Sequence, residues 1–173
     1  MEKIIFDRDA INRSLKRISH EILEKNHNLN DVVLVGIKTR GAFLAERLSK
    51  LIQEFEGVDI PFLALDVRGY RDDVKRGETG ENLEQPKMAL NEKAVIIVDD
   101  VLYTGRTVRA AMEAVLEYGR PSIIQLATLI DRGHRELPIR ADYTGKNIPT
   151  TKLETVKVFL TEVDGEDLVV ITY

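Results

Sequence analysis

The stretch at residues 95–107, V-I-I-V-D-D-V-L-Y-T-G-R-T, most narrowly limits the folds open to this chain. Four apolar residues run directly into two adjacent carboxylates, Asp99 and Asp100, and a short Thr/Gly turn then opens a helical pattern. A short β-branched apolar run is typical of a strand buried on both faces. Because two like charges at the end of such a strand gain nothing from packing, we expect them to hold a ligand.

The rest of the chain alternates strand-like apolar runs with amphipathic helical segments. Helices are predicted where apolar side chains recur at helical spacing, over residues 8–25, 44–55 and 108–116. Strands are predicted from short apolar runs over residues 31–36, 60–66 and 123–130. This alternation predicts one α/β domain over residues 1–173, with a mainly parallel central sheet flanked by helices on both faces.

Two segments depart from the alternation. Residues 69–93 are polar, contain glycine and proline, and show no clear period. A loop of this length inside a compact domain is often a functional lid. Residues 156–172 alternate well around Asp164-Gly165, which predicts a C-terminal β-hairpin.

Composition excludes several classes of protein. Cysteine is absent, so disulfides, thiol chemistry and Cys-based zinc sites are excluded. No apolar run approaches the roughly 20 residues of a membrane span, and the first residues lack a secretory pattern, so we expect a cytoplasmic protein. The net charge of -4 argues against a general nucleic-acid binder but leaves a local basic patch open.

In open parallel sheets, ligands collect beyond the carboxyl ends of the strands. Three polar, glycine-containing segments follow a predicted strand: residues 36–41, 99–107 and 131 onward. At the predicted helix start, Thr104–Thr107 offer backbone N–H groups to an anion, while the two carboxylates can accept from a diol, bind a cation, or both. A 5-phosphorylated ribose presents both groups. The residues alone also allow a structural role, in which the aspartates cap the strand and Thr104 caps the helix.

The 95–107 stretch resembles the phosphoribosyl-pyrophosphate (PRPP) signature of the type I phosphoribosyltransferases. With G-I-K-T-R-G at 36–41 and D-R-G-H-R-E-L-P-I-R-A-D-Y at 131–143, it resembles a narrower group. Members of that group regulate pyrimidine-operon attenuation and also act as uracil phosphoribosyltransferases. The resemblance covers nearly the whole chain. It implies the type I phosphoribosyltransferase fold, with a flexible lid loop at about 69–93 and a small hood region.

The resemblance also implies roles for individual residues. Asp99, Asp100 and Arg40 would be catalytic, and the two aspartates would hold the ribose hydroxyls near Mg²⁺, itself bound largely through PRPP. Lys38–Gly41 would form the pyrophosphate loop, and Asp131 and Arg132 would contact uracil. The full set implied to bind PRPP or nucleotide is Thr39, Arg40, Gly41, Val98, Asp99, Asp100, Val101, Leu102, Tyr103, Thr104, Gly105, Arg106 and Thr107. On spacing alone, the 38–41 segment could instead be a strand-to-helix turn with exposed charges, and the 131–135 segment a charged turn with a salt bridge.

A second implied activity is binding of pyrimidine leader mRNA, dependent on UMP or UTP. Arg13, Lys16, Arg17 and His20 recur at i, i+3, i+4 and i+7, which places them on one side of the first predicted helix. Further basic candidates are His134, Arg135, Arg140, Lys146 and Lys152. A solvated helix often carries such a face, so a structural role stays open. The expected partners are PRPP, uracil, UMP or UTP, the leader mRNA and further copies of the chain, as a homodimer or higher homo-oligomer.

Two alternatives remain at this point. The chain could be a phosphoribosyltransferase for another base, such as hypoxanthine or orotate, without RNA regulation. It could also be a pure RNA-binding regulator that uses the ribose-phosphate site only to sense nucleotides.

Overall fold

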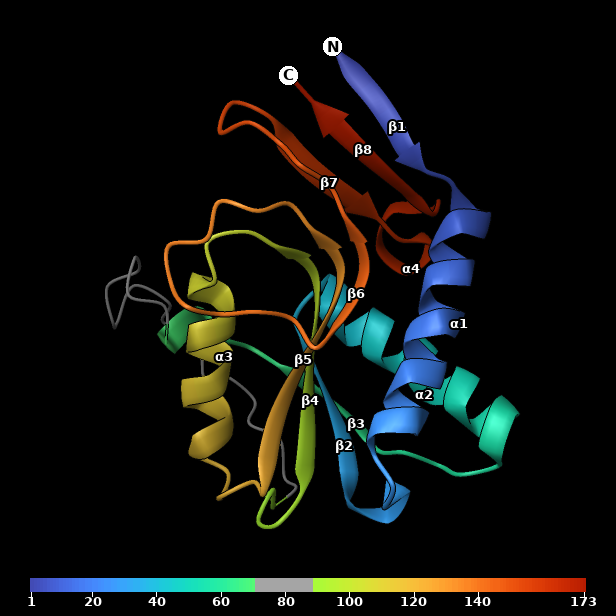
Figure 1. The fold of residues 1–173 in the computed structure, drawn as a ribbon, viewed down its shortest axis with the longest axis vertical. Helices are drawn as coiled ribbons and strands as arrows, with labels where there is room; N and C mark the ends of the chain where they lie inside the picture. The colour runs from blue at the N-terminus through green and yellow to red at the C-terminus, as the bar shows by residue number, and fades with distance from the viewer. Residues whose placement is uncertain (71–88) are drawn as a thin grey trace.

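The computed structural model describes residues 1–70 and 89–173. Its central feature is a five-stranded parallel sheet with the strand order β3-β2-β4-β5-β6 (Figure 1). The bounds of these strands are Phe62–Leu65 for β3, Val32–Ile37 for β2, Ala94–Leu102 for β4, Ile123–Asp131 for β5 and Tyr143–Asn147 for β6. The predicted α/β architecture is therefore confirmed.

Helices cover both faces of this sheet. Helices α1 (Arg8–Lys25) and α2 (Arg40–Glu56) lie on one face, and α3 (Arg106–Leu116) lies on the other (Figure 1). Short 3-10 turns, η1 (Leu29–Asp31) and η2 (Arg68–Tyr70), complete the connections. Helix α1 begins where the Asp7 carboxylate accepts a 2.8 Å hydrogen bond from the Ala10 N–H, as an N-cap residue does.

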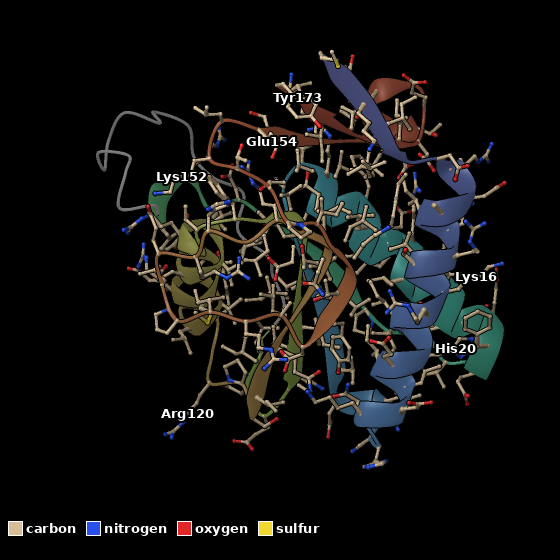
Figure 2. All side chains as sticks on the ribbon, turned by 45° about the horizontal axis from the view of Figure 1, so that its top comes forward. Lys16, His20, Arg120, Lys152, Glu154 and Tyr173 are labelled. Atoms are coloured by element: carbon tan, nitrogen blue, oxygen red, sulfur yellow. The ribbon has the colours of Figure 1, made fainter. Side chains whose placement is uncertain are left out.

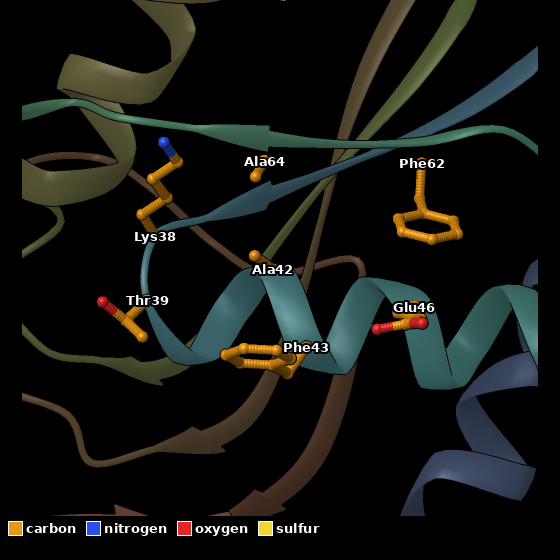
Figure 3. A pocket seen from close by; sticks show the side chains of 7 residues that line it. All are labelled: Lys38, Thr39, Ala42, Phe43, Glu46, Phe62 and Ala64. Carbon is orange, nitrogen blue, oxygen red and sulfur yellow. The ribbon is translucent and has the colours of Figure 1, made fainter. Parts of the chain in front are cut away.

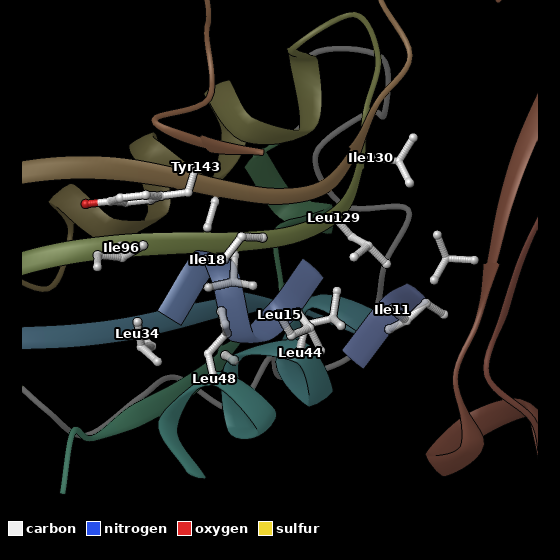
Figure 4. Close-up of a cluster of buried hydrophobic side chains, with 14 of the residues drawn as sticks. Ile11, Leu15, Ile18, Leu34, Leu44, Leu48, Ile96, Leu129, Ile130 and Tyr143 are labelled. Atoms are coloured by element: carbon white, nitrogen blue, oxygen red, sulfur yellow. The ribbon is translucent and has the colours of Figure 1, made fainter. Parts of the chain in front are cut away.

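The core lies between α1, α2 and the sheet. The predicted α1 stripe, Ile11, Leu15, Ile18 and Ile22, is fully buried. Figure 4 shows side chains of this stripe meeting those of α2, such as Leu44 and Leu48, beneath the sheet residues Leu34 and Ile96. A second cluster packs α3 on the opposite face, around Val95, Ile97 and Val108. Burial on both faces explains why the central strands are nearly continuous apolar runs.

A second, smaller sheet stands beside the first at the end where both termini lie (Figure 1). This hood sheet is antiparallel, with the order β1 (Glu2–Phe6), β8 (Leu168–Thr172), β7 (Thr155–Phe159). Between β7 and β8 the chain forms the short helix α4 (Thr161–Asp164), and Gly165 ends it with a φ of 81°. Strands β7 and β8 thus pair antiparallel as in the predicted hairpin, but Asp164-Gly165 lies at the end of a short helix in their connection and not in a tight turn.

Two further expectations concern the limits of segments. Strand β4 does not end at the aspartates, because its ladder with β5 continues to the pair Leu102–Asp131. The predicted lid at about 69–93 lies mostly outside the described residues. At its described borders, Tyr70 closes η2 and Leu90 is buried in the α3 cluster. Among the described residues, no helix is both long and apolar enough to cross a membrane.

The hood sheet is attached to α2 by ion pairs. The Arg47 guanidinium donates to both oxygens of Asp167 at 2.8 Å and also pairs with Glu162. The Asp167 side chain is only 4% exposed and also accepts from the Thr161 N–H and hydroxyl, both at 2.8 Å. The hydrogen bond from Arg47 holds the pKa of Asp167 well below its usual range. Charge and geometry therefore fix this corner of the hood against the core.

We expect Asp167→Asn to lower the free energy of unfolding by about 2 kcal/mol, because it neutralises the more buried of the two carboxylates that pair with Arg47 and leaves Glu162 as the other acidic partner. Since folding depresses the pKa of Asp167, its stabilisation is complete above the unfolded-state pKa of about 4 and is lost as the pH falls further. Urea unfolding at a series of pH values should show that the wild type loses stability below about pH 4 more steeply than the variant.

The control for this experiment is Lys50→Ala. Lys50 forms an exposed i,i+4 pair with Glu46, and the lysine side chain is 71% exposed. Its loss should change stability by less than about 0.5 kcal/mol. Equal effects of the two variants would contradict the role assigned to the Arg47–Asp167 pair.

Candidate active site

The parallel sheet brings three sequence segments to one edge. The turn after β2, the end of β4 and the residues after β5 follow neighbouring strands that run in the same direction. These are the segments at 36–41, 99–107 and 131 onward. The expectation that they meet at the carboxyl edge of the sheet is borne out, because adjacent parallel strands end side by side.

The turn between β2 and α2 packs directly on β4. A Cβ atom added to Gly41 would lie 2.4 Å from the Val98 carbonyl oxygen, and one added to Gly36 would lie 2.3 Å from the Gly41 carbonyl oxygen. Both distances are far below van der Waals contact, so only glycine fits at either position. This close approach sets the Lys38–Arg40 turn, which contains a cis peptide bond between Lys38 and Thr39, beside Asp99.

The start of α3 forms a small cavity next to the first aspartate. Gly105, with a φ of 94°, precedes the first helical residue, and the Thr104 hydroxyl accepts a 3.3 Å hydrogen bond from the Arg106 N–H. The cavity holds about 120 Å³, and its lining is Asp99, Val101, Leu102, Tyr103, Thr104, Gly105, Thr107 and Val108. The structure thus brings a carboxylate together with the N-terminal N–H groups of a helix, which favour an anion.

The second aspartate lines a different cavity. A space of about 270 Å³ lies between Arg40, Asp100 and the β7 residues 156–159. Successive side chains of a strand point to opposite faces, which is why adjacent carboxylates can serve separate cavities. Sequence reasoning treated the two as one pair and assigned no role to β7. The alternation at 155–159 marked a strand, but nothing in the sequence placed that strand over Asp100.

The Arg40 side chain is held from the hood. Its Nε and Nη2 donate to the Asp164 carboxylate at 3.2 and 2.8 Å. The hydrogen bond from Arg40 lowers the pKa of Asp164 below its ordinary value. The predicted anion-binding arginine therefore already has a carboxylate partner, a residue 124 positions later in the chain that sequence reasoning had not selected.

The segment after β5 is hydrogen-bonded to the loop that leads into α3. Backbone N–H groups of Glu136 and Leu137 donate to the Thr104 carbonyl at 2.9 and 3.2 Å, and the Arg132 N–H donates to Leu102. The Arg135 guanidinium donates to the Tyr103 carbonyl at 2.6 Å. The 131–137 segment and the anion cavity are therefore one connected unit.

Several predicted binding side chains have protein partners here. The Arg132 guanidinium donates to the carbonyls of Thr151 and Glu154 and lies 3.9 Å from the centre of the Tyr103 ring. Asp131 accepts from Arg135 at 2.6 Å. Arg135 also donates to the Ile139 carbonyl, so all three of its nitrogens are engaged. His134 contacts the Thr150 carbonyl through Nε2.

The basic candidates on α1 lie beside β6. A cavity of about 330 Å³ is lined by Phe6, Ala10, Arg13, Ser14, Arg17 and Lys146. Arg17 donates to the carbonyls of Thr144 and Gly145, and the His20 ring stacks on Phe55 with a centroid distance of 4.2 Å. Arg13 and Lys16 are exposed, as is Arg140. Figure 2 shows Lys16 and His20 on the outer side of α1 and Lys152 on the opposite side of the view.

An apolar cavity that the sequence did not indicate lies on the other side of the Lys38 turn. It holds about 360 Å³ between α2 and β3, and its lining is Lys38, Thr39, Ala42, Phe43, Glu46, Phe62 and Ala64 (Figure 3). The Phe62 side chain is 43% exposed on this edge strand. The only sequence feature that could have indicated this cavity is Phe62, an aromatic residue on a short predicted strand.

A resident metal site is not evident in the described ranges 1–70 and 89–173. They contain no group of three or more histidine, cysteine or acidic side chains that could hold an ion. Asp99 and Asp100 nevertheless supply carboxylate oxygens, the ligands that Mg²⁺ prefers, and Mg²⁺ commonly completes its shell with substrate phosphates and water. The donor set therefore fits a cation that arrives with a phosphorylated ligand.

Comparison with known proteins identifies the class to which this fold belongs. The family model described as phosphoribosyl transferase domain matches residues 2–163. A hypoxanthine phosphoribosyltransferase of Trypanosoma cruzi, solved with the product IMP, superposes with a TM-score of 0.77 at 22% identity, covering 99% of this chain and 94% of that one. At this identity the likeness shows the fold. Fold and site together define a phosphoribosyltransferase.

Full-length relatives narrow the class. A protein named bifunctional protein PyrR from Clostridium perfringens is 58% identical over 95% of this chain and 94% of its own length. One from Bacillus pumilus with the same name is 55% identical, covering 97% and 96%. The chain belongs to the PyrR family of phosphoribosyltransferases.

We expect Gly41→Ala to destabilise the protein by about 1–3 kcal/mol, because the new methyl group would overlap the Val98 carbonyl. The Lys38–Arg40 turn should move away from Asp99, and affinity for magnesium pyrophosphate should fall. Urea unfolding and titration calorimetry measure the two effects.

Gly57→Ala is the matched control. Gly57 ends α2 with a φ of 68°, and no atom lies within 4 Å of a Cβ built there. This variant should show only the left-handed backbone cost of about 1 kcal/mol, with unchanged pyrophosphate binding. Unchanged pyrophosphate affinity in Gly41→Ala would show that the close approach does not position the turn.

Proposed function

We propose that this protein converts uracil and PRPP to UMP and diphosphate, and that it also regulates a pyrimidine operon by binding leader mRNA. The observation that carries the enzymatic half is the convergence of three strand ends. They unite a helix N-terminus, two aspartates and a basic, glycine-flanked turn at one edge of the sheet. A substrate with a 5-phosphate, a ribose and a pyrophosphate presents a matching group to each.

In this proposal the 5-phosphate of PRPP lies in the cavity at Thr104–Thr107. Four backbone N–H groups at the helix start have no helical acceptor, and Gly105 adopts the positive φ with which this helix opens. Asp99 lines the same cavity and is placed to accept hydrogen bonds from ribose hydroxyls. Val101, Leu102 and Tyr103 complete the wall around the sugar.

Pyrophosphate leaves toward the Lys38–Gly41 turn and Arg40. Breaking the bond at the ribose C1 develops negative charge on pyrophosphate and positive charge on the sugar ring. Arg40 and the turn N–H groups stabilise the negative charge on pyrophosphate. The Asp99 and Asp100 carboxylates lie close to the positive charge on the sugar ring. Mg²⁺ bound with PRPP would neutralise further phosphate charge, and the two aspartates are the residues that would hold it.

Uracil fits the cavity between Arg40, Asp100 and β7. In the described part of the chain, β7 pairs only with β8, so its other edge has N–H and C=O groups not used in a sheet. Strands β4 and β7 are in contact, and β7 residues line the same cavity as Asp100. The alternating donors and acceptors of uracil match such an edge. Arg132 supports the uracil cavity indirectly, because its guanidinium donates to the Thr151 and Glu154 carbonyls just before β7. Asp131 also acts indirectly, by accepting a hydrogen bond from Arg135.

The regulatory half rests on the basic surface of α1 and β6. Arg13, Arg17 and Lys146 line one cavity together with the Phe6 ring, and Lys16 is exposed on the same helix. Cations attract RNA phosphates, and arginine guanidinium planes can stack on unpaired bases, as in recognition of RNA loops. The net charge of -4 does not prevent this, because the charges are local.

The structure offers a physical reason for dependence on UMP or UTP. The 131–137 segment is hydrogen-bonded to Tyr103 and Thr104, at the cavity proposed for the nucleotide phosphate. The same segment leads through Arg140 into β6 and Lys146. A nucleotide that orders the cavity would therefore also order the segment carrying RNA candidates. Since PRPP, uracil and nascent transcript meet in the cytoplasm, we place the protein there, as a homodimer or higher homo-oligomer.

The alternatives are less well supported. The hypoxanthine phosphoribosyltransferases among the solved structures are 20–24% identical to this chain, whereas the full-length relatives at 50–58% identity are named bifunctional. A pure RNA regulator would not need Arg40, the two aspartates and the Thr104–Thr107 cavity to stand together. We therefore keep uracil transfer and RNA regulation as one proposal.

Purified protein with PRPP and Mg²⁺ should form UMP from uracil and no nucleotide from hypoxanthine or orotate. The double variant Asp99→Asn, Asp100→Asn should lose turnover by a thousandfold or more, on the order expected when charge stabilisation at the reacting centre is removed. Its affinity for UMP should fall less than about tenfold, because the helix N–H groups still bind the phosphate. Nucleotide formation from hypoxanthine in preference to uracil would overturn the assignment of substrate.

The double variant Arg13→Ala, Lys16→Ala should weaken UMP-dependent binding of pyrimidine leader RNA by roughly tenfold and flatten its salt dependence. We select these residues because Arg17 and His20 have structural partners in β6 and α2. A gel shift at several salt concentrations measures both quantities. Lys50→Ala, an exposed lysine on α2, is the control, and equal loss in both variants would place the RNA surface elsewhere.

A further inference from the structure

Arg40 and Asp164 join two parts of the molecule that the sequence holds far apart. Arg40 is the first residue of α2, and Asp164 is the last residue of α4 in the hood. The guanidinium donates through two nitrogens, Nε at 3.2 Å and Nη2 at 2.8 Å, to the two oxygens of one carboxylate. Such a two-pronged pair fixes the plane of the guanidinium as well as its distance.

The carboxylate is itself held in place. One oxygen of Asp164 accepts the Leu160 N–H at 2.9 Å, closing the first turn of the hood helix. The Asp164 side chain is 16% exposed and that of Arg40 is 32% exposed. An arginine with this much exposure would sample many rotamers if nothing held its end. The pair therefore restrains a side chain that would otherwise be mobile.

The restrained guanidinium faces the reaction chemistry. Arg40 directly follows the Lys38–Thr39 peptide of the turn proposed for pyrophosphate and borders the cavity proposed for uracil, and its Nη1 has no hydrogen bond to any residue of the described ranges. That nitrogen remains available to a ligand. We propose that Asp164 is a positioning residue, which holds Arg40 from the hood so that the guanidinium meets the pyrophosphate leaving group. This inference rests on the proposed phosphoribosyl transfer and assigns a function to a hood residue.

A neighbouring pair supplies the contrast. Arg47 lies seven residues after Arg40, on the same side of α2, and it binds the same hood segment through Glu162 and Asp167. Arg47 is not among the residues that line the Asp100 cavity. Two arginines thus attach the hood to α2, but only one of them faces the site. A purely structural role for Asp164 would make it behave like Glu162.

The experiment also tests the opposite hypothesis, in which Asp164 weakens pyrophosphate binding. The carboxylate and pyrophosphate are both anions that Arg40 can bind, so Asp164 could compete with the ligand. Competition predicts that neutralising Asp164 tightens pyrophosphate binding, whereas positioning predicts that it weakens binding. The bonds to Nε and Nη2 leave Nη1 accessible, which is why we favour positioning.

The test compares Asp164→Asn with Glu162→Gln in the full chain. Product inhibition by magnesium pyrophosphate and by UMP is measured during uracil transfer, and calorimetry gives the dissociation constant of magnesium pyrophosphate directly. We expect Asp164→Asn to weaken pyrophosphate and PRPP binding about tenfold, the loss of one positioning contact to a charged group, with UMP binding changed less than twofold. Glu162→Gln should leave both ligands unchanged.

A double-mutant cycle separates positioning from general destabilisation. In an Arg40→Ala background the carboxylate has no guanidinium to hold, so Asp164→Asn should add no further loss. Asp164→Glu keeps the charge but moves it by one methylene, so its affinity for pyrophosphate should lie between those of wild type and Asp164→Asn. If Asp164→Asn does not fold, Asp164→Glu replaces it in the comparison. Thermal unfolding verifies that each variant is folded.

Each outcome has a clear meaning. Unchanged or tighter pyrophosphate binding in Asp164→Asn, additive losses in the cycle, or equal effects of Asp164→Asn and Glu162→Gln would overturn the inference. If the wild type forms no UMP, the proposed function fails, but calorimetry with pyrophosphate still decides whether Asp164 positions Arg40. The two failures are therefore distinguishable.

Discussion

The parallel pairing of β4 with β2 on one side and β5 on the other is the constraint on which the site depends. It forces three strand ends to meet, and close packing at Gly41 sets the basic turn against β4 with no room for a side chain. A helix start, two carboxylates and an arginine then lie at one edge of the sheet, where they line two cavities. Apolar burial on both faces supplies the stability that lets like charges stand together at this edge.

The hood sheet gives the site its second wall. Its free edge strand β7 covers the cavity at Asp100, and α4 reaches α2 through paired charges. Arginine suits this connection because its planar guanidinium donates two hydrogen bonds to one carboxylate, which fixes the relative orientation of the two groups. The hood is therefore part of the proposed chemistry and not only a cover for the core.

Where the sequence is strongly periodic, the predicted elements agree closely with the structure. The stripe Ile11, Leu15, Ile18 and Ile22 predicted a helix over 8–25, and α1 spans Arg8–Lys25. The 95–107 stretch correctly placed a buried strand before a helix that opens with Gly105. Boundaries set by pairing were less well predicted: β4 runs past Asp100, because its ladder with β5 decides where it ends. Arg132 was selected as a uracil contact by its place after a predicted strand and Arg135 as a basic RNA candidate, and their carbonyl partners come from segments that no local pattern connects to them.

The sequence by itself determined the alternating elements, the family and the residue types at the edge of the sheet, because local periodicity and short motifs encode them. Only the tertiary structure decided that Asp99 and Asp100 line separate cavities, that β7 lies over one of them, and that Asp164 holds Arg40. These relations join residues across as many as 124 positions. Contacts of that range arise from packing and charge pairing between completed elements, which no local pattern contains.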